Sequence, residues 1–288
     1  MTNQTPDRRS RLRRLAVILG TNEIASAVAI PLHRRGYDVV LSHDPSPPVI
    51  RRKMAFHDAL FGDPMTIEGV AAVRAETSVT LRDRLGEARG VIITELGLLD
   101  LIAIRTLDVL IDARMQKYVV KPDLRWLARS TIGLGPGFVS GDNCDIAVET
   151  RPDKAGLLVE QGATDEPDGR PAPLGDALSE RFGRAEINGR WHTAIDIGTR
   201  VYKGFIVGHL GSAPVAAPFD GLLRGVVRDG TEVPAGAKLF EVDPRGRLAN
   251  ATEFDTRVTA IADGTMRALG QREAGLAVQT GRAIHLVK

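Results

Sequence analysis

The chain has 288 residues, of which 43% are hydrophobic and 26% charged, and its formal net charge is +2. This length accommodates two domains of ordinary size, and the composition is typical of a folded globular protein. The single cysteine, Cys144, excludes an intramolecular disulfide and a cysteine-rich metal site, and the six histidines include no closely spaced pair. We therefore expect no metal site, and we expect Cys144 to be buried and unreactive.

Most of the positive charge lies at the N-terminus, because residues 1–14 contain five arginines and one aspartate and the remainder carries −2. We interpret residues 1–14 as a disordered basic tail, which an acidic partner could also cover. The rest of the sequence has no basic patch of the kind that nucleic-acid binding requires. No apolar run reaches the ~18 residues of a membrane span, and no signal peptide is recognisable, so we expect a cytoplasmic protein.

Residues 15–44 predict a βαβ unit. Leu15–Leu19 is a short apolar run of the kind found in buried parallel strands, and residues 39–41 form a second such run. Between them, apolar side chains at helical spacing predict a helix over residues 23–35. A strand, a helix and a strand in this order form a right-handed unit of a parallel sheet.

The turn that opens this helix is the first candidate site. It retains only the first glycine of a dinucleotide fingerprint, and Glu23 places a carboxylate at the helix N-terminus, where a phosphate would bind. Asp44, after the second strand, stands where a ribose hydroxyl is usually recognised. Two interpretations stay open, a structural turn and a nucleotide site formed by Gly20, Asn22, Glu23 and Asp44.

Three cations, Arg51, Arg52 and Lys53, follow a proline-rich connection and lie near the start of a predicted helix over residues 49–60. Positive charge in the first turn opposes the helix dipole, so this position favours a nearby anion or an acidic partner. A solvated basic face is an equally good interpretation. Arg51 and Arg52 are therefore candidate anion-binding residues.

Strand and helix signals continue to alternate, which predicts a doubly wound parallel sheet in a Rossmann-like α/β domain over residues 15–150. A glycine-rich loop, residues 133–138, follows a predicted strand and therefore lies at the carboxyl edge of the sheet, where open α/β sheets bind ligands. Its glycines, Gly133, Gly135 and Gly137, permit either a close approach of the backbone to a ligand or a tight turn.

The last third of the chain contains an internal repeat. After a polar segment, residues 151–184, which predicts a linker or surface excursion, residues 185–204 and 217–236 share the pattern Ala-x-x-x-Gly, eight residues, Gly-Thr-x-Val-x-x-Gly. Two such halves, with the valines facing inward, resemble the barrel-sandwich hybrid of biotinyl and lipoyl carriers. We assign residues 185–288 to this β-rich domain and its C-terminal extension. Residues 207–215, which join the halves, contain no lysine, so neither biotin nor lipoate is expected.

A family resemblance rests on three groups of residues in a fixed order. They are Val49-Ile50-Arg51-Arg52 with Glu68-Gly69-Val70, Ile132–Phe138 with Asp145 and Glu149-Thr150, and residues 214–225 continuing to 246. Over about residues 15–270, the chain resembles the accessory proteins of the selenium-dependent molybdenum hydroxylase system. The resemblance implies a maturation factor for a molybdenum hydroxylase of the xanthine dehydrogenase type, with a Rossmann-like half.

This sequence departs from the family at two positions. The family has Gly-Gly-Gly-Asp where this chain has Gly20-Thr21-Asn22-Glu23, which weakens any inference of nucleotide binding. The family has a Gly-His step where this chain has Asp153-Lys154, so selenium dependence is not implied.

Three hypotheses for function follow. The first is a non-catalytic, chaperone-like accessory protein that binds molybdenum hydroxylase subunits or the molybdenum cofactor, molybdopterin, whose phosphate would suit the glycine loops, Arg51 and Arg52. The second is a nucleotide-dependent oxidoreductase that uses the Rossmann-like half. The third is a scaffold that only docks proteins. The sequence contains no recognisable pair of base and nucleophile, which favours a non-catalytic function.

Overall fold

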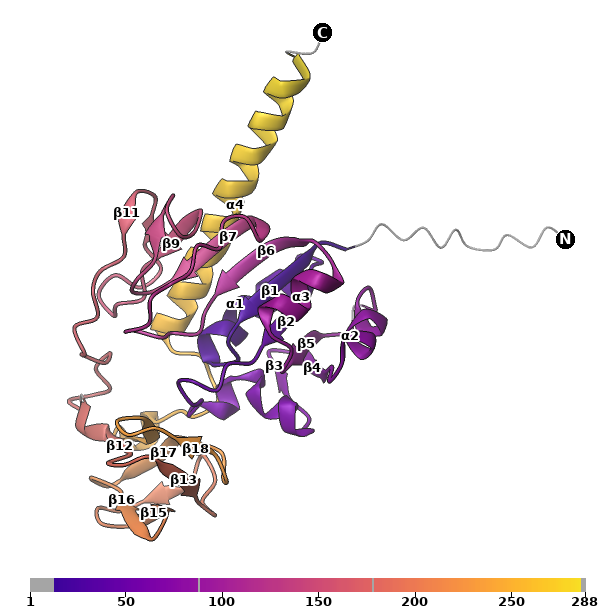
Figure 1. The fold of residues 1–288 in the computed structure, drawn as a ribbon. Helices are drawn as coiled ribbons and strands as arrows, with labels where there is room; N and C mark the ends of the chain where they lie inside the picture. Colours follow the sequence, from indigo (N-terminus) through magenta and orange to yellow (C-terminus); the bar gives the residue numbers. More distant parts are fainter. Residues whose placement is uncertain (1–12, 88, 178, 286–288) are drawn as a thin grey trace, which may run out of the picture.

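The computed structural model describes residues 13–87, 89–177 and 179–285 (Figure 1). This part of the chain is a mixed α/β protein with one large, mainly parallel sheet and three smaller antiparallel sheets. Residues 1–12 of the predicted basic tail lie outside the described residues. Arg13 and Arg14 belong to the fold, since Arg13 Nε donates to Gly36 O at 2.9 Å and the Arg14 guanidinium lies 4.3 Å from the centroid of the Tyr37 ring.

The large sheet has the strand order β10-β9-β7-β6-β1-β2-β5-β4-β3, and all its pairs are parallel except the outermost pair at each edge. Its strands are β1 (Leu15–Leu19), β2 (Asp38–Ser42), β3 (Thr66–Ile67), β4 (Val70–Arg74), β5 (Val91–Thr94), β6 (Leu107–Asp112), β7 (Ala128–Leu134), β9 (Ile146–Val148) and β10 (Leu158–Val159). The predicted parallel sheet is therefore confirmed, with β1 at its centre.

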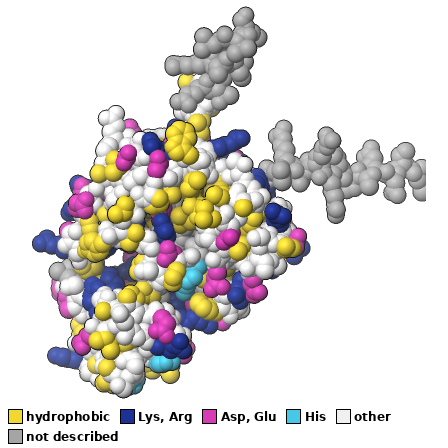
Figure 2. Space-filling view, in the orientation of Figure 1, with side chains coloured by type: hydrophobic (Ala, Val, Ile, Leu, Met, Phe, Trp, Pro, Cys, Tyr) yellow, Lys and Arg dark blue, Asp and Glu magenta, His cyan; other side chains and the backbone are white. Residues whose placement is uncertain are grey.

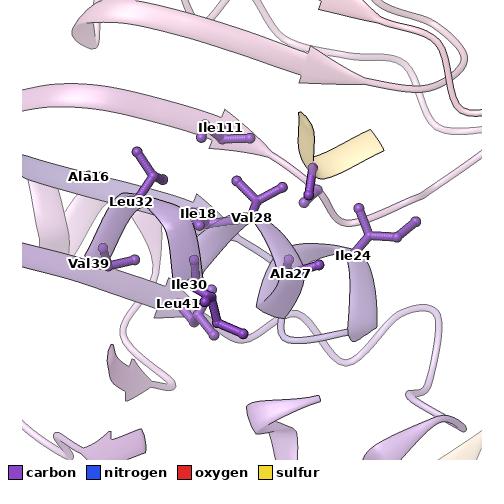
Figure 3. Close-up of a cluster of buried hydrophobic side chains, with 14 of the residues drawn as sticks. Ala16, Ile18, Ile24, Ala27, Val28, Ile30, Leu32, Val39, Leu41 and Ile111 are labelled. Atoms are coloured by element: carbon purple, nitrogen blue, oxygen red, sulfur yellow. The ribbon is translucent and has the colours of Figure 1, made fainter. Parts of the chain in front are cut away.

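Helices cover both faces of this sheet. On one face lie α1 (Glu23–Arg34), which connects β1 to β2, and α4 (Thr256–His285), which packs against α1. Figure 3 shows Ile24 and Val28 of α1 beside Ile18 and Ile111 of the sheet, in the largest apolar core. The other face carries α2 (Ser78–Arg84) and α3 (Leu98–Ile104), whose apolar side chains form a second core with β1 and β6.

The structure corrects two sequence-based assignments. The helix predicted over residues 49–60 is wrong, because two short 3₁₀ helices, η1 (Arg52–Met54) and η2 (Phe56–Phe61), occupy this segment. Between them Ala55 is extended, with φ −136° and ψ 148°, which no continuous helix permits. The C-terminal extension assigned to the β-rich domain packs on the large sheet instead, since Val258 and Ile261 of α4 are buried in its core.

The β-rich part consists of two four-stranded antiparallel sheets, with the orders β12-β19-β17-β14 and β16-β15-β13-β18. Their strands are β12 (Phe182–Arg184), β13 (Gly189–His192), β14 (Arg200–Val201), β15 (Ile206–Leu210), β16 (Ala213–Ala216), β17 (Gly221–Val226), β18 (Glu232–Val233) and β19 (Lys238–Asp243). The predicted inward valines, Val201 and Val233, are buried in a separate apolar core around Trp191.

The pairing of strands explains the repeat. Strand β14 of the first copy pairs with β17 of the second, and β18 of the second copy pairs with β13 of the first, so each sheet contains strands of both copies. The repeated glycines have positive φ angles, which favour glycine because it has no Cβ. They are Gly198, Gly204, Gly230 and Gly236, with φ between 78° and 96°.

Short elements connect the two parts. The predicted linker, residues 151–184, carries β10, then β11 (Gly162–Ala163), which pairs with β8 (Val139–Ser140), and finally η3 (Ser179–Arg181) and β12. After β19, η4 (Gly246–Leu248) and an irregular segment lead back to α4 on the large sheet. None of the described helices combines the length and apolar character that a membrane crossing needs.

Candidate functional site: a cationic cleft

A cleft of about 530 Å³ lies between the carboxyl edge of the large sheet and the β-rich part. Its walls are loops that follow β2, β6 and β9, together with residues of β12 and β19 and the first turn of α4. Figure 2 shows a hollow between the two parts, at which Lys and Arg side chains gather. Open α/β sheets commonly bind ligands at this edge.

Eight Lys and Arg residues line this cleft, and four of them come from four separate elements. These four are Lys117 in the loop after β6, Arg184 on β12, Lys238 on β19 and Arg257 on α4. Among the described residues, none of the four has a carboxylate oxygen within 4.0 Å, whereas neighbouring Arg151 pairs with both Asp153 and Asp165. Five carboxylates also line the cleft, against eight cations, so the cleft carries an excess of positive charge.

The charges of these groups affect one another's pKa values. Burial lowers the pKa of Lys117, and the charges of Arg257 and Arg184 lower it further, while Asp168 raises it. Burial also lowers the pKa of Arg257, and Arg51 acts in the same direction, whereas Glu23 and Asp255 act in the opposite one. The cations therefore repel one another, and a bound anion would relieve this repulsion.

Backbone carbonyl groups hold two of the cations in place. Arg184 Nη1 donates to Gly236 O at 3.0 Å, and Arg257 Nε donates to Thr150 O at 2.8 Å. Each guanidinium has five N–H groups, so one backbone bond leaves most of its donors for a ligand.

A buried ionic network forms the floor of the cleft. The Glu241 carboxylate, which is fully buried, accepts from Arg51 Nε at 2.8 Å and Arg181 Nε at 2.8 Å, and Arg224 Nη1 lies 3.5 Å away. Arg51 Nη1 also lies 3.3 Å from both a Glu23 and an Asp255 oxygen. These contacts tie β17 and β19 to the loop after β2 and to the start of α4.

The structure brings three of the residues proposed from the sequence to the cleft, namely Asn22, Glu23 and Arg51. Their polar groups bond mainly within the protein. The Asn22 side chain accepts the Ile24 and Ala25 N–H groups at 3.0 Å, and Glu23 pairs with Arg51. The Asn22 side chain thus already occupies two of the N–H groups that a phosphate would use at the N-terminus of α1.

Three further candidates lie outside the cleft lining. Arg52 bonds to Asp58 Oδ2 at 2.5 Å and to Val226 O at 2.8 Å. Asp44 accepts from Gln116 Nε2 at 3.1 Å. At Gly20, with φ 109°, a Cβ would come within 3.0 Å of a backbone oxygen, so this glycine allows a close passage between strands β1 and β6.

The glycine-rich loop is packed by side chains of the protein. A Cβ at Gly133 would lie 2.1 Å from the Phe138 ring, and one at Gly135, with φ 88°, would lie 2.6 Å from Thr150 Oγ1. At Gly137, with φ 86°, a Cβ would meet a lysine side chain at 3.3 Å. None of these three glycines lines the cleft. Side chains of the protein fill the space beside them that a ligand would otherwise use.

Two other polar groups lie apart from the cleft. Thr21 Oγ1 lies 2.9 Å from His57 Nδ1 and 3.3 Å from His43 Nδ1, and burial lowers the pKa of His57 to about 3, so this ring is neutral. Cys144 is fully buried, as expected, and burial raises the pKa of its thiol to about 12. Within the described ranges, no group of three His, Cys, Asp or Glu side chains is arranged to hold a metal ion.

Sequence reasoning missed the four cations. They are spread from residue 117 to residue 257, in elements of no common motif, so no local pattern in the sequence could have grouped them.

Comparisons with known proteins give one clear relative. No protein-family model matches the chain. The chain is 33% identical over 266 residues to the uncharacterized protein YqeB of Escherichia coli K12, and the match covers 88% of this chain and 47% of YqeB. This chain therefore spans about half the length of that relative.

Similar solved structures include a succinylglutamate desuccinylase/aspartoacylase from Rhodobacter sphaeroides, with 12% identity, a TM-score of 0.22 and coverage of 76% of this chain and 62% of that chain. The apo form of the ectoine utilization protein EutE (DoeB) from Ruegeria pomeroyi has 13% identity, a TM-score of 0.24 and coverage of 80% and 86%. TM-scores of this size do not establish a shared fold, and we draw no function from them.

Proposed function

We propose that the cleft binds an anionic, phosphate-bearing organic ligand. The observation that carries this proposal is the convergence of Lys117, Arg184, Lys238 and Arg257 without a carboxylate partner among the described residues. A phosphate accepts charge-assisted hydrogen bonds from such groups, and these bonds are about twice as strong as neutral ones.

We further propose that this ligand is the molybdenum cofactor, carried as cargo by an accessory protein of a molybdenum hydroxylase. The family resemblance supports this identity, and the cleft suits a planar ring with a phosphate, because Tyr118, Phe182 and several prolines line it beside the cations. Lys117, Arg184 and Arg257 would hold the phosphate. The metal of this cargo would serve the client enzyme, a hydroxylase of the xanthine dehydrogenase type in the cytoplasm.

In this proposal, both halves of the chain contribute to ligand binding. We interpret the parallel sheet as Rossmann-like and the β-rich part as a barrel-sandwich hybrid, an interpretation supported by the exchange of strands between its two repeat copies. The β-rich part contributes Arg184 and Lys238 to the cleft, the loop after β6 contributes Lys117, and α4 contributes Arg257. A ligand would therefore contact both parts.

The other two hypotheses receive less support. A nucleotide-dependent oxidoreductase would use the turn before α1, whose first N–H groups are bonded to Asn22. A scaffold that only docks proteins gives no reason for cations without a carboxylate partner to converge on one cleft. We rank the accessory protein first for these two reasons.

We expect Arg257→Gln and Lys117→Gln each to weaken the binding of inorganic pyrophosphate by about 10-fold or more, because each removes a charge-assisted hydrogen bond worth about 1.5–3 kcal/mol. Isothermal titration calorimetry on the full chain measures this change. Arg190→Gln is the matched control, since Arg190 is exposed and pairs with Glu232 on the surface of the β-rich part. Equal affinities of the Arg257 and Arg190 variants would remove the cleft as the anion site.

The identity of the ligand requires a second experiment. Wild-type protein, expressed in cells that make the molybdenum cofactor, is denatured, and the supernatant is tested for fluorescent pterin, molybdenum and nicotinamide. Pterin released by the wild type and absent from Arg257→Gln supports the proposal. Release of nicotinamide would support the oxidoreductase hypothesis. If the supernatant contains neither pterin nor nicotinamide, and the protein also binds no pyrophosphate, only the scaffold hypothesis remains.

A further inference from the structure

Lys238 differs from the other cations of the cleft in the surroundings of its amine. It begins β19, and its Nζ lies 3.6 Å from the centroid of the Phe182 ring. Within the described residues, this Nζ forms no hydrogen bond and no ion pair. By contrast, Lys121 Nζ donates to Gln116 O at 2.8 Å and Lys154 Nζ donates to Asp165 at 2.7 Å.

Burial and three nearby cations favour a neutral amine at Lys238, while the charge of Glu241 opposes them. Burial is the main cause that lowers its pKa, and the cations Arg51, Lys117 and Arg184 lower it further, to about 7. Glu241 acts in the opposite direction, but its carboxylate is held by three arginines in the buried network. At neutral pH a substantial fraction of the amine therefore carries a free lone pair.

We propose that Lys238 is a nucleophilic amine that condenses with the carbonyl carbon of an anionic aldehyde or ketone bound in the cleft. Lys238 lines a cleft that can hold the substrate, and Lys117, Arg184 and Arg257 line the same cleft and can bind the anionic group. Lysines that form imines are typically desolvated or lie next to other cations, and Lys238 has both features.

The reaction needs no oxidant and no reductant. The Nζ lone pair attacks the carbonyl carbon and forms the C–N bond, while the electron pair of the C=O double bond moves to oxygen. The nitrogen then gives up its two protons, and the oxygen leaves as water, so that an imine joins Lys238 to the substrate. This inference rests on the proposed anion site, and it does not require that the molybdenum cofactor be its natural ligand.

Pyridoxal 5′-phosphate, an anionic aldehyde, is the probe that tests this inference. The full chain is incubated with the probe, reduced with borohydride and analysed by peptide mass spectrometry. We expect Lys238 to be modified at least about 10-fold faster than exposed Lys203 at pH 7, because an ordinary lysine is almost entirely protonated there. The rate at Lys238 should be half-maximal near pH 7, since its pKa is about 7.

Two variants and a second probe complete the test. Lys238→Arg should abolish this adduct, whereas Lys203→Arg should leave the adduct at Lys238 unchanged. Pyridoxal, which lacks the phosphate, should react with Lys238 at least about 10-fold more slowly, because it loses the charge-assisted bonds.

The outcomes separate this inference from the proposed function. Modification of Lys238 no faster than that of Lys203, in a protein that binds pyrophosphate, would overturn the nucleophile and leave the anion site intact. A rate that keeps rising to about pH 10 would overturn it as well, because that is the behaviour of an ordinary lysine. Equal rates with the two probes, in a protein that binds no pyrophosphate, would overturn the anion site on which the inference rests.

Discussion

Glu241→Gln is expected to lower the free energy of unfolding by about 3–5 kcal/mol, the cost of leaving buried charges without their partner. The Glu241 carboxylate is fully buried and forms ion pairs with Arg51, Arg181 and Arg224. Glutamine has nearly the same volume and keeps one acceptor oxygen, so the change removes charge and little packing. Because the network joins the β-rich part to the large sheet, both parts should lose stability.

Urea unfolding followed by tryptophan fluorescence measures this loss. Trp191 is fully buried in the β-rich core and Trp126 is 86% exposed, so a Trp126→Phe background isolates the signal of the core. Glu232→Gln is the matched control, because its pair with Arg190 is exposed and worth less than about 1 kcal/mol. If both glutamine variants unfold at the same urea concentration, the buried network does not stabilise the fold.

The same network predicts a pH dependence. Burial raises the pKa of Glu241, but Arg51 and the other arginines outweigh it and lower the value from 4.5 to about 2. A lowered folded-state pKa means that the stabilisation is fully present above about pH 4.5 and is lost as the pH falls through about 2. Wild type should therefore lose stability over this range, and Glu241→Gln should lack this contribution.

Gly264→Ala is expected to lower the free energy of unfolding by about 1–3 kcal/mol, the usual cost of overpacking a close contact. Gly264 lies where α4 crosses the loop before β10, and a Cβ there would lie 2.3 Å from Gly156 O. That oxygen also accepts from Arg267 Nη2 at 2.9 Å, which holds the loop in place. The new methyl group must therefore push α4 away from the large sheet.

Gly270→Ala provides the control for this change. Gly270 lies in the same helix and is exposed, and a Cβ added there would meet no atom within 4 Å, so alanine should stabilise α4 by up to about 1 kcal/mol through helix propensity. Thermal unfolding followed by far-UV circular dichroism should shift the two midpoints in opposite directions. A Gly264→Ala midpoint at or above that of the wild type would contradict the close crossing.

Local patterns in the sequence predicted much of the secondary structure. The run Leu15–Leu19 is β1 without change, and the spacing of apolar residues places the start of α1 at residue 23. The same reasoning failed at residues 49–60, because Arg51 is held outside any helix by Glu23, Asp255 and Glu241. Those partners lie up to 204 residues away along the chain, beyond the reach of a local pattern.

The candidate site shows the same limit. Glycines at the carboxyl edge of the sheet suggested a loop open to ligands, but Phe138 and Thr150 fill the space at Gly133 and Gly135. A glycine pattern indicates only that something approaches the backbone closely, and here that neighbour is the protein itself. Asn22, Glu23 and Arg51 do reach the cleft, where their main contacts are with other residues of the chain.

The sequence by itself determined the alternation of strands and helices in the first half and the paired copies in the β-rich part, because periodicity and glycine spacing act over a few residues. Only the tertiary structure decided that Lys117, Arg184, Lys238 and Arg257 face one cleft. Charge repulsion between them has no meaning in the extended chain and arises when folding brings four distant elements together. The chemistry that we propose for this protein depends on that convergence.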